Sequence, residues 1–200
     1  MNKINVPRRL LMIRLITAIL TILIAIYVSP LNACVGKTLH IGVIGTPNDL
    51  LLAELVSQLI TERTGTSVKI ESFKGQKELY NSVKQGDVGL LIGNTDLAME
   101  TIGKPRGTSG KAAFETLKAE YRKNLNLIWL EPFGTVPGAS GAQLYAPVIT
   151  NEILGSLPAL PKLLQKLSGI TNDSGYQRLL KAKGDEKKVA RAFLKSKKLI

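Results

Sequence analysis

Between residues 37 and 94 the apolar positions switch between short runs and helical spacing, which predicts the order strand, helix, strand, helix, strand. Leu39–Ile44 is an apolar run that ends at Gly45, as expected of a buried strand. The next segment has apolar residues at helical spacing from Leu52 to Ile60. Gly65 is suited to end this helix, because glycine readily adopts a left-handed conformation.

The second half of this region repeats the scheme. Thr66–Phe73 alternates between apolar and polar residues, Gln76–Gly86 carries apolar residues at helical spacing, and Val88–Ile92 is another buried strand. Strands that alternate with helices in this way form parallel sheets. The predicted fold class is therefore α/β, with a central, mostly parallel sheet flanked by helices.

Residues 103–200 continue with both kinds of element, but less regularly. A loop is predicted at Gly103–Gly110, a helix at Lys111–Lys123 and a strand at Leu125–Leu130. Pro132–Gly141 is rich in glycine and proline and is predicted to be a flexible connector. Extended structure resumes over Leu144–Ile149. The remaining helices are expected around Pro161–Leu167, Asp173–Lys181 and Val189–Leu194.

Residues 1–34 have the pattern of a secretory signal peptide rather than of a folded domain. Leu15–Val28 is an apolar run, shorter than the roughly 20 residues that a spanning helix needs. The sequence Leu31-Asn32-Ala33-Cys34 then resembles a bacterial lipobox, so Cys34 is the expected lipidation site. The basic residues that precede the apolar run are Lys3, Arg8, Arg9 and Arg14.

Cys34 is the only cysteine, so the chain has no intramolecular disulfide. Three fates of the N-terminus are open: a lipidated Cys34, an uncleaved anchor lengthened by Leu10–Ile13, or release of a cleaved protein. Each of them exports the domain to the periplasm or the outer face of the inner membrane. The first two also anchor it to the membrane.

Size and charge narrow the class of protein further. Without the first 33 residues, 167 of the 200 remain, which is enough for one domain with a proper core. The net charge is +12, and a basic surface can serve nucleic-acid binding. Export and the lack of a basic stripe interleaved with aromatic residues argue against that partner. The charge is expected either to solubilise the protein or to face anionic headgroups.

Catalysis has little support in the residue types present. His40 is the only histidine, and no Ser-His-Asp combination, metal-ligand cluster or phosphate-binding loop occurs in the sequence. Asp96 and Glu100 lie one helical turn apart and are expected to form a solvated helix edge. We therefore predict that the protein is not an enzyme and has no metal or cofactor.

Polar residues that follow the ends of three predicted strands are the candidate ligand-binding residues. The carboxyl ends of parallel strands meet at one edge of a sheet, where these residues would form a polar half-site. The same residue types cap helices and form turns, so a purely structural role is the alternative. Trp129 and Phe133 could face a ligand, but an apolar strand around Trp129 favours the core. The candidates are Thr46, Asn48, Asp49, Lys74, Gln76, Asn94, Thr95 and Asp96.

Several longer stretches carry a family resemblance. They are Ile41–Glu62, Lys74–Leu90, Ala119–Gly134 with its WLEPFG segment, Tyr145–Leu154 (YAPVITNEIL), Leu160–Leu164 and Val189–Lys195 (VARAFLK). On these stretches the chain resembles the glycine betaine, choline and carnitine substrate-binding proteins of ABC importers. The resemblance implies a lobe of the periplasmic-binding-protein type II-like fold.

One departure from this family concerns its second lobe. Family members fold as two lobes that close on the ligand, and the second lobe, of roughly a hundred residues, lies between the stretches that match WLEPFG and YAPVITNEIL. Here residues 135–144 form a short connector in its place. The expected organisation is thus the first part of one lobe at 37–134, this connector, and a C-terminal helical part of the same lobe at 145–200.

The other departure concerns the ligand. The family holds a quaternary ammonium in a cage of aromatic rings, a cation–π site. Its first strand–helix loop carries an aromatic residue where this chain has Thr46–Asp49, and its third strand ends in a tyrosine-rich segment where this chain has Leu90–Asp96. Neither segment holds an aromatic residue here, so no cage residue carries over.

The resemblance predicts an extracytoplasmic solute-binding component of an ABC importer. Its expected partners are permease subunits, a quaternary amine or related solute, and the membrane, but not nucleic acid. The alternative is a membrane-tethered lipoprotein that has lost small-molecule binding and acts as an interaction module.

Overall fold

The computed structural model describes residues 38–106, 110–138, 141–181 and 185–200. The expected export signal and Cys34 lie outside these residues. Within the described ranges, no helix combines the length and the apolar character that a bilayer crossing requires.

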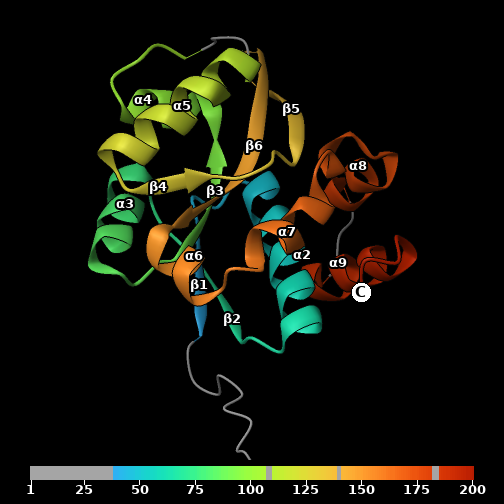
Figure 1. Cartoon of the computed structure of the whole chain (residues 1–200). Helices are drawn as coiled ribbons and strands as arrows, with labels where there is room; N and C mark the ends of the chain where they lie inside the picture. The colour runs from blue at the N-terminus through green and yellow to red at the C-terminus, as the bar shows by residue number, and fades with distance from the viewer. Residues whose placement is uncertain (1–37, 107–109, 139–140, 182–184) are drawn as a thin grey trace, which may run out of the picture. The chain divides into compact units, whose positions relative to one another are not determined.

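One six-stranded sheet organises the domain, in the order β2-β1-β3-β6-β4, with β5 also paired to β6 (Figure 1). β1 pairs in parallel with β2 and β3, whereas β6 runs antiparallel to β3, β4 and β5. The described strands other than β6 therefore point one way, which confirms the α/β class with a mostly parallel sheet. The strands are β1 (Leu39–Val43), β2 (Val68–Ser72), β3 (Leu90–Asn94), β4 (Leu127–Trp129), β5 (Gly134–Gly138) and β6 (Gly141–Thr150).

Helices cover both faces of this sheet (Figure 1). One face packs against α2 (Pro47–Thr64), α7 (Leu160–Leu164), α8 (Ser174–Lys181) and α9 (Glu186–Ser196). The other packs against α3 (Gln76–Gln85), α4 (Thr95–Thr101) and α5 (Gly110–Asn124). The short helix α6 (Asn151–Ser156) follows β6, and two 3-10 turns, η1 (Gln165–Leu167) and η2 (Ile170–Asn172), lie between α7 and α8.

The ends of α2 and α3 are fixed by local chemistry that the sequence already indicated. The Thr46 side chain accepts a hydrogen bond from the Asp49 N–H, and the Asp49 carboxylate accepts one from the Thr46 N–H, both at 3.2 Å. This reciprocal capping satisfies two amides that the first turn of a helix leaves free. At the other ends, Gly65 (φ 70°) and Gly86 (φ 83°) adopt the left-handed conformation that stops a helix.

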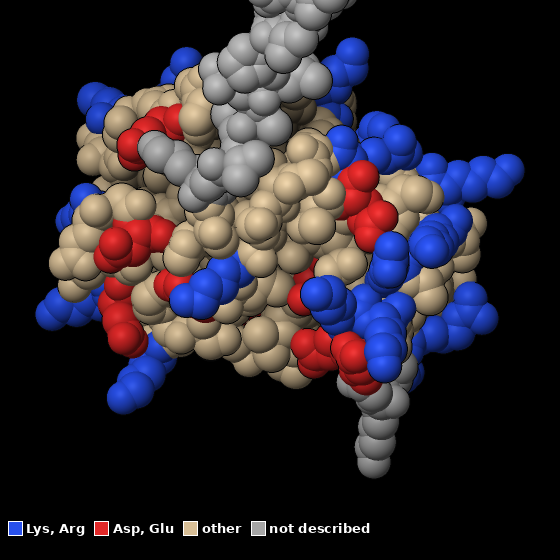
Figure 2. Space-filling model, turned by 90° about the horizontal axis from the view of Figure 1, so that it is seen from below, with Lys and Arg blue, Asp and Glu red and all other residues tan. Residues whose placement is uncertain are grey.

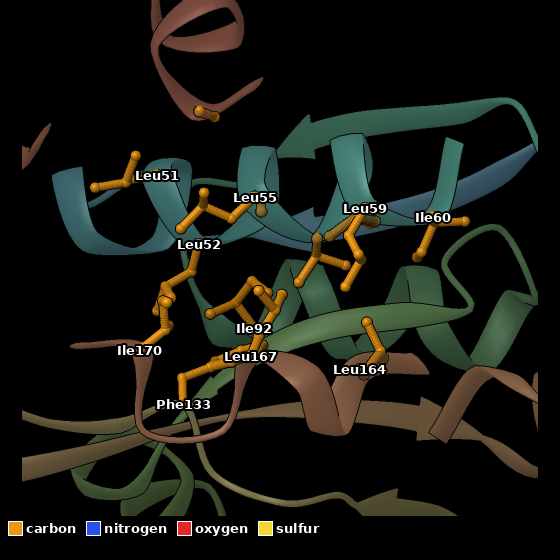
Figure 3. Packing of buried hydrophobic residues seen from close by; sticks show 14 of the residues in the cluster. Leu51, Leu52, Leu55, Leu59, Ile60, Ile92, Phe133, Leu164, Leu167 and Ile170 are labelled. Carbon is orange, nitrogen blue, oxygen red and sulfur yellow. The ribbon is translucent and has the colours of Figure 1, made fainter. Parts of the chain in front are cut away.

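Alternate strand residues face two separate apolar cores. Leu90 and Ile92 of β3 face the core beneath α2, whereas Leu91 faces the core beneath α5. The middle of α2 is buried because α9 packs along it on the side away from the sheet, through Phe193 and Leu194. Figure 3 shows residues of the first core. They are Leu51, Leu52, Leu55, Leu59 and Ile60 of α2, together with Ile92, Phe133, Leu164, Leu167 and Ile170.

Trp129 and Phe133 belong to these cores, as the apolar strand around Trp129 predicted. Trp129 is 1% exposed and Phe133 is fully buried. The Trp129 indole meets Phe114 and Tyr121 edge-on, with ring centroids 6.0 and 5.5 Å away. Its N–H is buried without a hydrogen-bond partner among the described residues. Neither ring is available to a ligand.

The prediction of a flexible connector at Pro132–Gly141 is wrong. Gly134–Gly138 forms β5, which pairs with the first half of β6 in a hairpin. Val136 and Leu144 are buried where this hairpin packs on the domain. Glycine and proline suggested a loop, but β5 is an edge strand, where the missing N–H of Pro137 is tolerated. The hairpin therefore extends the sheet.

Candidate functional site

The order of the strands creates a topological switch point between β1 and β3. The chain leaves β1 through α2 on one face of the sheet and leaves β2 through α3 on the other, yet β1 and β3 are neighbours. In α/β sheets, ligands bind in the crevice outside the carboxyl ends of the strands at such a point. Asn48 and Asp49 follow β1, and Asn94 ends β3, so the sequence candidates from these two strands meet here.

Asp49, the charged candidate that follows β1, is buried, with only 2% of its surface exposed. Burial raises the pKa of its carboxyl group, and hydrogen bonds from Thr46 oppose that rise. Asp49 forms no ion pair among the described residues, so its negative charge is offset only by hydrogen bonds and the amino end of α2.

The residues at the end of β3 form a second polar group, tied to the hairpin. The Asn94 side chain caps α4 by accepting from the Asp96 N–H at 2.9 Å. Its amide also donates to Oε1 of Gln143 at 2.7 Å, and the Gln143 amide donates to Oδ2 of Asp96 at 3.1 Å. The Thr95 hydroxyl accepts from the Leu144 N–H at 3.1 Å. Each of these candidates therefore has a structural partner.

The prediction that Asp96 and Glu100 form a solvated helix edge is wrong for Asp96. Asp96 is only 4% exposed, although Glu100 is exposed to solvent and pairs with Arg106. The reason is that α4 begins directly at the end of β3, so its first turn is covered by Gln143 of β6. Asp96, like Asp49, forms no ion pair within the described part of the chain.

Two tyrosines at this edge were not among the candidates predicted from the sequence. Tyr145 of β6 lies opposite Asn94 in the sheet register, and Tyr176 of α8 donates a 3.0 Å hydrogen bond to Oδ1 of Asn48. Burial raises the pKa of both phenols, and the Asp49 carboxylate raises each further. The local sequence after β1 and β3 does not reveal these tyrosines, because they reach the edge from β6 and α8, which lie far along the chain.

The two candidates before and in α3 are placed differently. Lys74 is exposed, and its N–H binds the Glu78 side chain at 3.0 Å, so its amide serves the start of α3. Gln76 accepts a hydrogen bond from Thr101 and lines a shallow pocket together with Asp49 and Asn94. The pocket also contacts Ile44 and Leu97. The structure therefore brings Gln76 to the site but gives no such role to Lys74.

This pocket has about 290 Å³ of free space when the adjoining open solvent is included. The enclosed part of it is only about 10 Å³, room for about one water molecule. Pockets that enclose small ligands measure about 300–1,000 Å³, so this surface is a shallow half-site. Asp49 is the acidic residue of its lining, and Asp96 lies nearby, because both carboxylates raise the pKa of the Tyr145 phenol. In the described ranges, no three His, Cys, Asp or Glu side chains are grouped to hold a metal ion. The arrangement suits an organic cation better than an anion.

Comparison with solved structures identifies this architecture. A structure of a glycine betaine/carnitine/choline ABC transporter protein is similar with a TM-score of 0.70 and 12% identity, over 82% of this chain and 98% of that one. Apo YehZ from Escherichia coli is similar with a TM-score of 0.69 and 12% identity, over 82% of this chain and 100% of that one. A choline-binding protein of an ABC transporter, in complex with choline, has a TM-score of 0.57 and 12% identity, over 80% of this chain and 89% of that one. These likenesses establish the fold.

The family itself is established by sequence. No curated protein matches the chain. Residues 37–137, about half of the chain, match the family model described as the substrate-binding domain of ABC-type glycine betaine transport systems. This match and the three structures confirm the resemblance drawn from the sequence. The chain belongs to the family of substrate-binding domains of ABC-type glycine betaine transport systems.

Proposed function

We propose that this chain is the extracytoplasmic solute-binding component of an ABC importer, and that it holds a quaternary ammonium solute at the open edge of one lobe. The observation that carries the proposal is the pair of buried carboxylates, Asp49 and Asp96, without ion pairs among the described residues. A buried carboxylate favours a nearby positive charge. A cation above the pocket would supply it.

The expected binding mode differs from capture between two lobes. The chain between β4 and Tyr145 contains the β5–β6 hairpin, and we infer that this hairpin stands where a second lobe would be inserted. Closure of two lobes around the solute is then impossible within one chain. The solute keeps one side in water, so its dissociation constant is expected near the millimolar range, equivalent to about −4 kcal/mol.

Export and anchoring complete the proposal. An N-terminal signal would deliver the domain to the periplasmic side of the membrane, where lipid on Cys34 or an uncleaved anchor would keep it beside the permease. Tethering raises the effective concentration of the domain at its partner, which offsets weak capture of the solute.

Isothermal titration calorimetry with glycine betaine, choline and carnitine tests the proposal. A neutral analogue of choline, 3,3-dimethylbutan-1-ol, separates recognition of charge from recognition of shape. The variants Asp49→Asn and Asp96→Asn should weaken binding of the cations, whereas Asp87→Asn, an exposed control between α3 and β3, should leave it unchanged. Equal binding of choline and its neutral analogue, or no heat with any cation at tens of millimolar, would refute the proposal.

The shallow pocket supports a second function. A lobe whose pocket encloses only about 10 Å³ holds a small solute poorly but can still dock on a protein. In that case the tethered domain is an interaction module that has lost its solute. Recovery of permease subunits with the full chain from membranes, together with no response to any cation in the calorimeter, would favour this function over solute capture.

A further inference from the structure

The final helix and the residues after it carry a dense positive surface. We define it as the α9 stripe, which consists of Lys187, Lys188, Arg191, Lys195 and Lys198. All five are exposed, because α9 turns Ala190, Phe193 and Leu194 toward α2 and leaves the opposite side to solvent. Figure 2 shows that Lys and Arg side chains gather on the side of the molecule that holds α9.

Much of this charge is not neutralised within the domain. Lys188 pairs with Asp185 at 3.7 Å and Arg191 with Glu62 at 2.8 Å. Lys187, Lys195 and Lys198 form no ion pair with other described residues. The stripe therefore presents a surplus of cations to whatever lies against it.

Two hydrogen bonds place the end of the α9 stripe near the start of β1. The Leu39 N–H at the start of β1 donates to the Ser67 carbonyl at 2.8 Å. Arg63 lies in the last turn of α2, and Ser67 follows it four residues later. The Arg63 side chain in turn donates to the Leu199 carbonyl at 2.7 Å, directly after Lys198. The stripe thus ends on the same side of the domain as Leu39, the first residue of β1.

From this placement we propose that the α9 stripe docks on anionic phospholipid headgroups, on the membrane that holds the N-terminus. From Cys34 to Leu39 a fully extended chain reaches at most about 18 Å. A lipid on Cys34 would therefore keep this end of the domain within about 18 Å of the surface. A tilt of the domain then brings the exposed lysines within the Debye length of about 8 Å over which the surface attracts them. The opposite edge of the sheet, with the pocket, then faces away from the bilayer.

This docking is independent of whether a solute binds, and chemical labelling of lysines can test it. The full chain is incorporated into vesicles of phosphatidylcholine alone or of phosphatidylcholine mixed with phosphatidylglycerol. A water-soluble acylating reagent is added, and mass spectrometry follows each lysine. Lys195 and Lys198 should react about fivefold more slowly on the anionic vesicles, the factor expected for one lysine near such a surface. High salt should remove the protection.

Charge reversal supplies the matched comparison. Lys195→Glu with Lys198→Glu should abolish the protection of Lys187 and Lys188, with the fold verified by circular dichroism. Lys111→Glu with Lys118→Glu makes the same change of charge on α5, which covers the other face of the sheet, and should leave the protection intact. Equal protection on neutral and anionic vesicles would overturn the proposal. So would protection that appears only when permease subunits are present, because the stripe would then contact protein.

Discussion

The Tyr176 hydroxyl donates a 3.0 Å hydrogen bond to Oδ1 of Asn48, and so joins two residues that lie 128 positions apart in the chain. Tyr176 is fully buried on α8, whereas Asn48 lies in the first turn of α2 at the edge where the candidate site forms. This contact fixes the C-terminal helices to the beginning of α2.

Tyr176→Phe should lower the free energy of unfolding by about 0.5–1.5 kcal/mol, because it removes this hydrogen bond and preserves the ring packing. Asn48→Ala should cost a similar amount. Since both changes break the same bond, the double variant should lose less than the sum of the two single losses. Urea unfolding followed by circular dichroism measures all three. Strict additivity would show that the contact contributes nothing to stability.

Two glycines give a sharper contrast in packing. A methyl group at Gly93 of β3 would lie 2.8 Å from both Trp129 Cη2 and Val148 Cγ2, whereas one at Gly155 of α6 would meet nothing within 4 Å. Gly93→Ala should therefore destabilise the domain by about 1–3 kcal/mol through overpacking. Gly155→Ala should stabilise it by a few tenths to about 1 kcal/mol through helix propensity.

The melting temperatures of the two glycine variants report these effects, and the signs of their shifts should be opposite. A Gly93→Ala protein as stable as wild type would mean that Trp129 is free to move. That result would contradict the tight packing of the core beneath α5.

Local sequence signals were sufficient for the first half of the domain. The run from β1 to β3 was predicted because its strands and helices have clear periods and because glycines such as Gly65 and Gly86 end the helices. The hairpin was missed, since the glycine and proline content of β5 masks a strand that only pairing with β6 stabilises.

The residues of the candidate site also fall into those that local sequence predicts and those that it does not. Asp49 and Asn94 could be found because they follow strands directly. Tyr145, Tyr176 and Gln143 could not, because they reach the site through tertiary packing from residues about 50 to 130 positions away.

The pH dependence of stability should distinguish two carboxylates with opposite shifts. Burial raises the pKa of Asp49 above its ordinary value of 3.8. Between pH 3.8 and the higher pKa of the folded protein, Asp49 is ionised in the unfolded chain but still protonated in the folded one. The free energy of unfolding therefore falls as the pH rises through this range. Asp49→Asn removes this loss, so the variant should gain on wild type as the pH rises from 3 toward neutrality.

Glu71 provides the control of opposite sign. Hydrogen bonds from Lys69 and His40 lower its pKa below the ordinary 4.5. Its contribution to stability is therefore complete above pH 4.5 and is lost as the pH falls through the lower, folded-state pKa. Glu71→Gln should be less stable than wild type at neutral pH and approach it in acid. Unfolding in urea at a series of pH values measures both differences, and parallel curves for the two variants would contradict the opposite shifts.

Gln143 should be a structural support of the candidate site, because it bridges two buried groups. Its side chain accepts from Asn94 at 2.7 Å and donates to Asp96 at 3.1 Å, and these partners are only 6% and 4% exposed. Gln143→Ala leaves both without that partner, so unfolding should become easier by about 1–3 kcal/mol. Gln85→Ala, at the exposed end of α3, should change stability by less than about 0.5 kcal/mol.

Hydrogen exchange of the full chain locates the effect of the Gln143 change. The amides of β5 and of the first half of β6 should exchange faster in Gln143→Ala than in wild type, while those of α9 keep their rates, because the lost bonds join the hairpin to β3 and α4 alone. Uniformly faster exchange would instead mean that the whole domain unfolds as one unit. Unchanged exchange in the hairpin would show that its pairing to β3 suffices without Gln143.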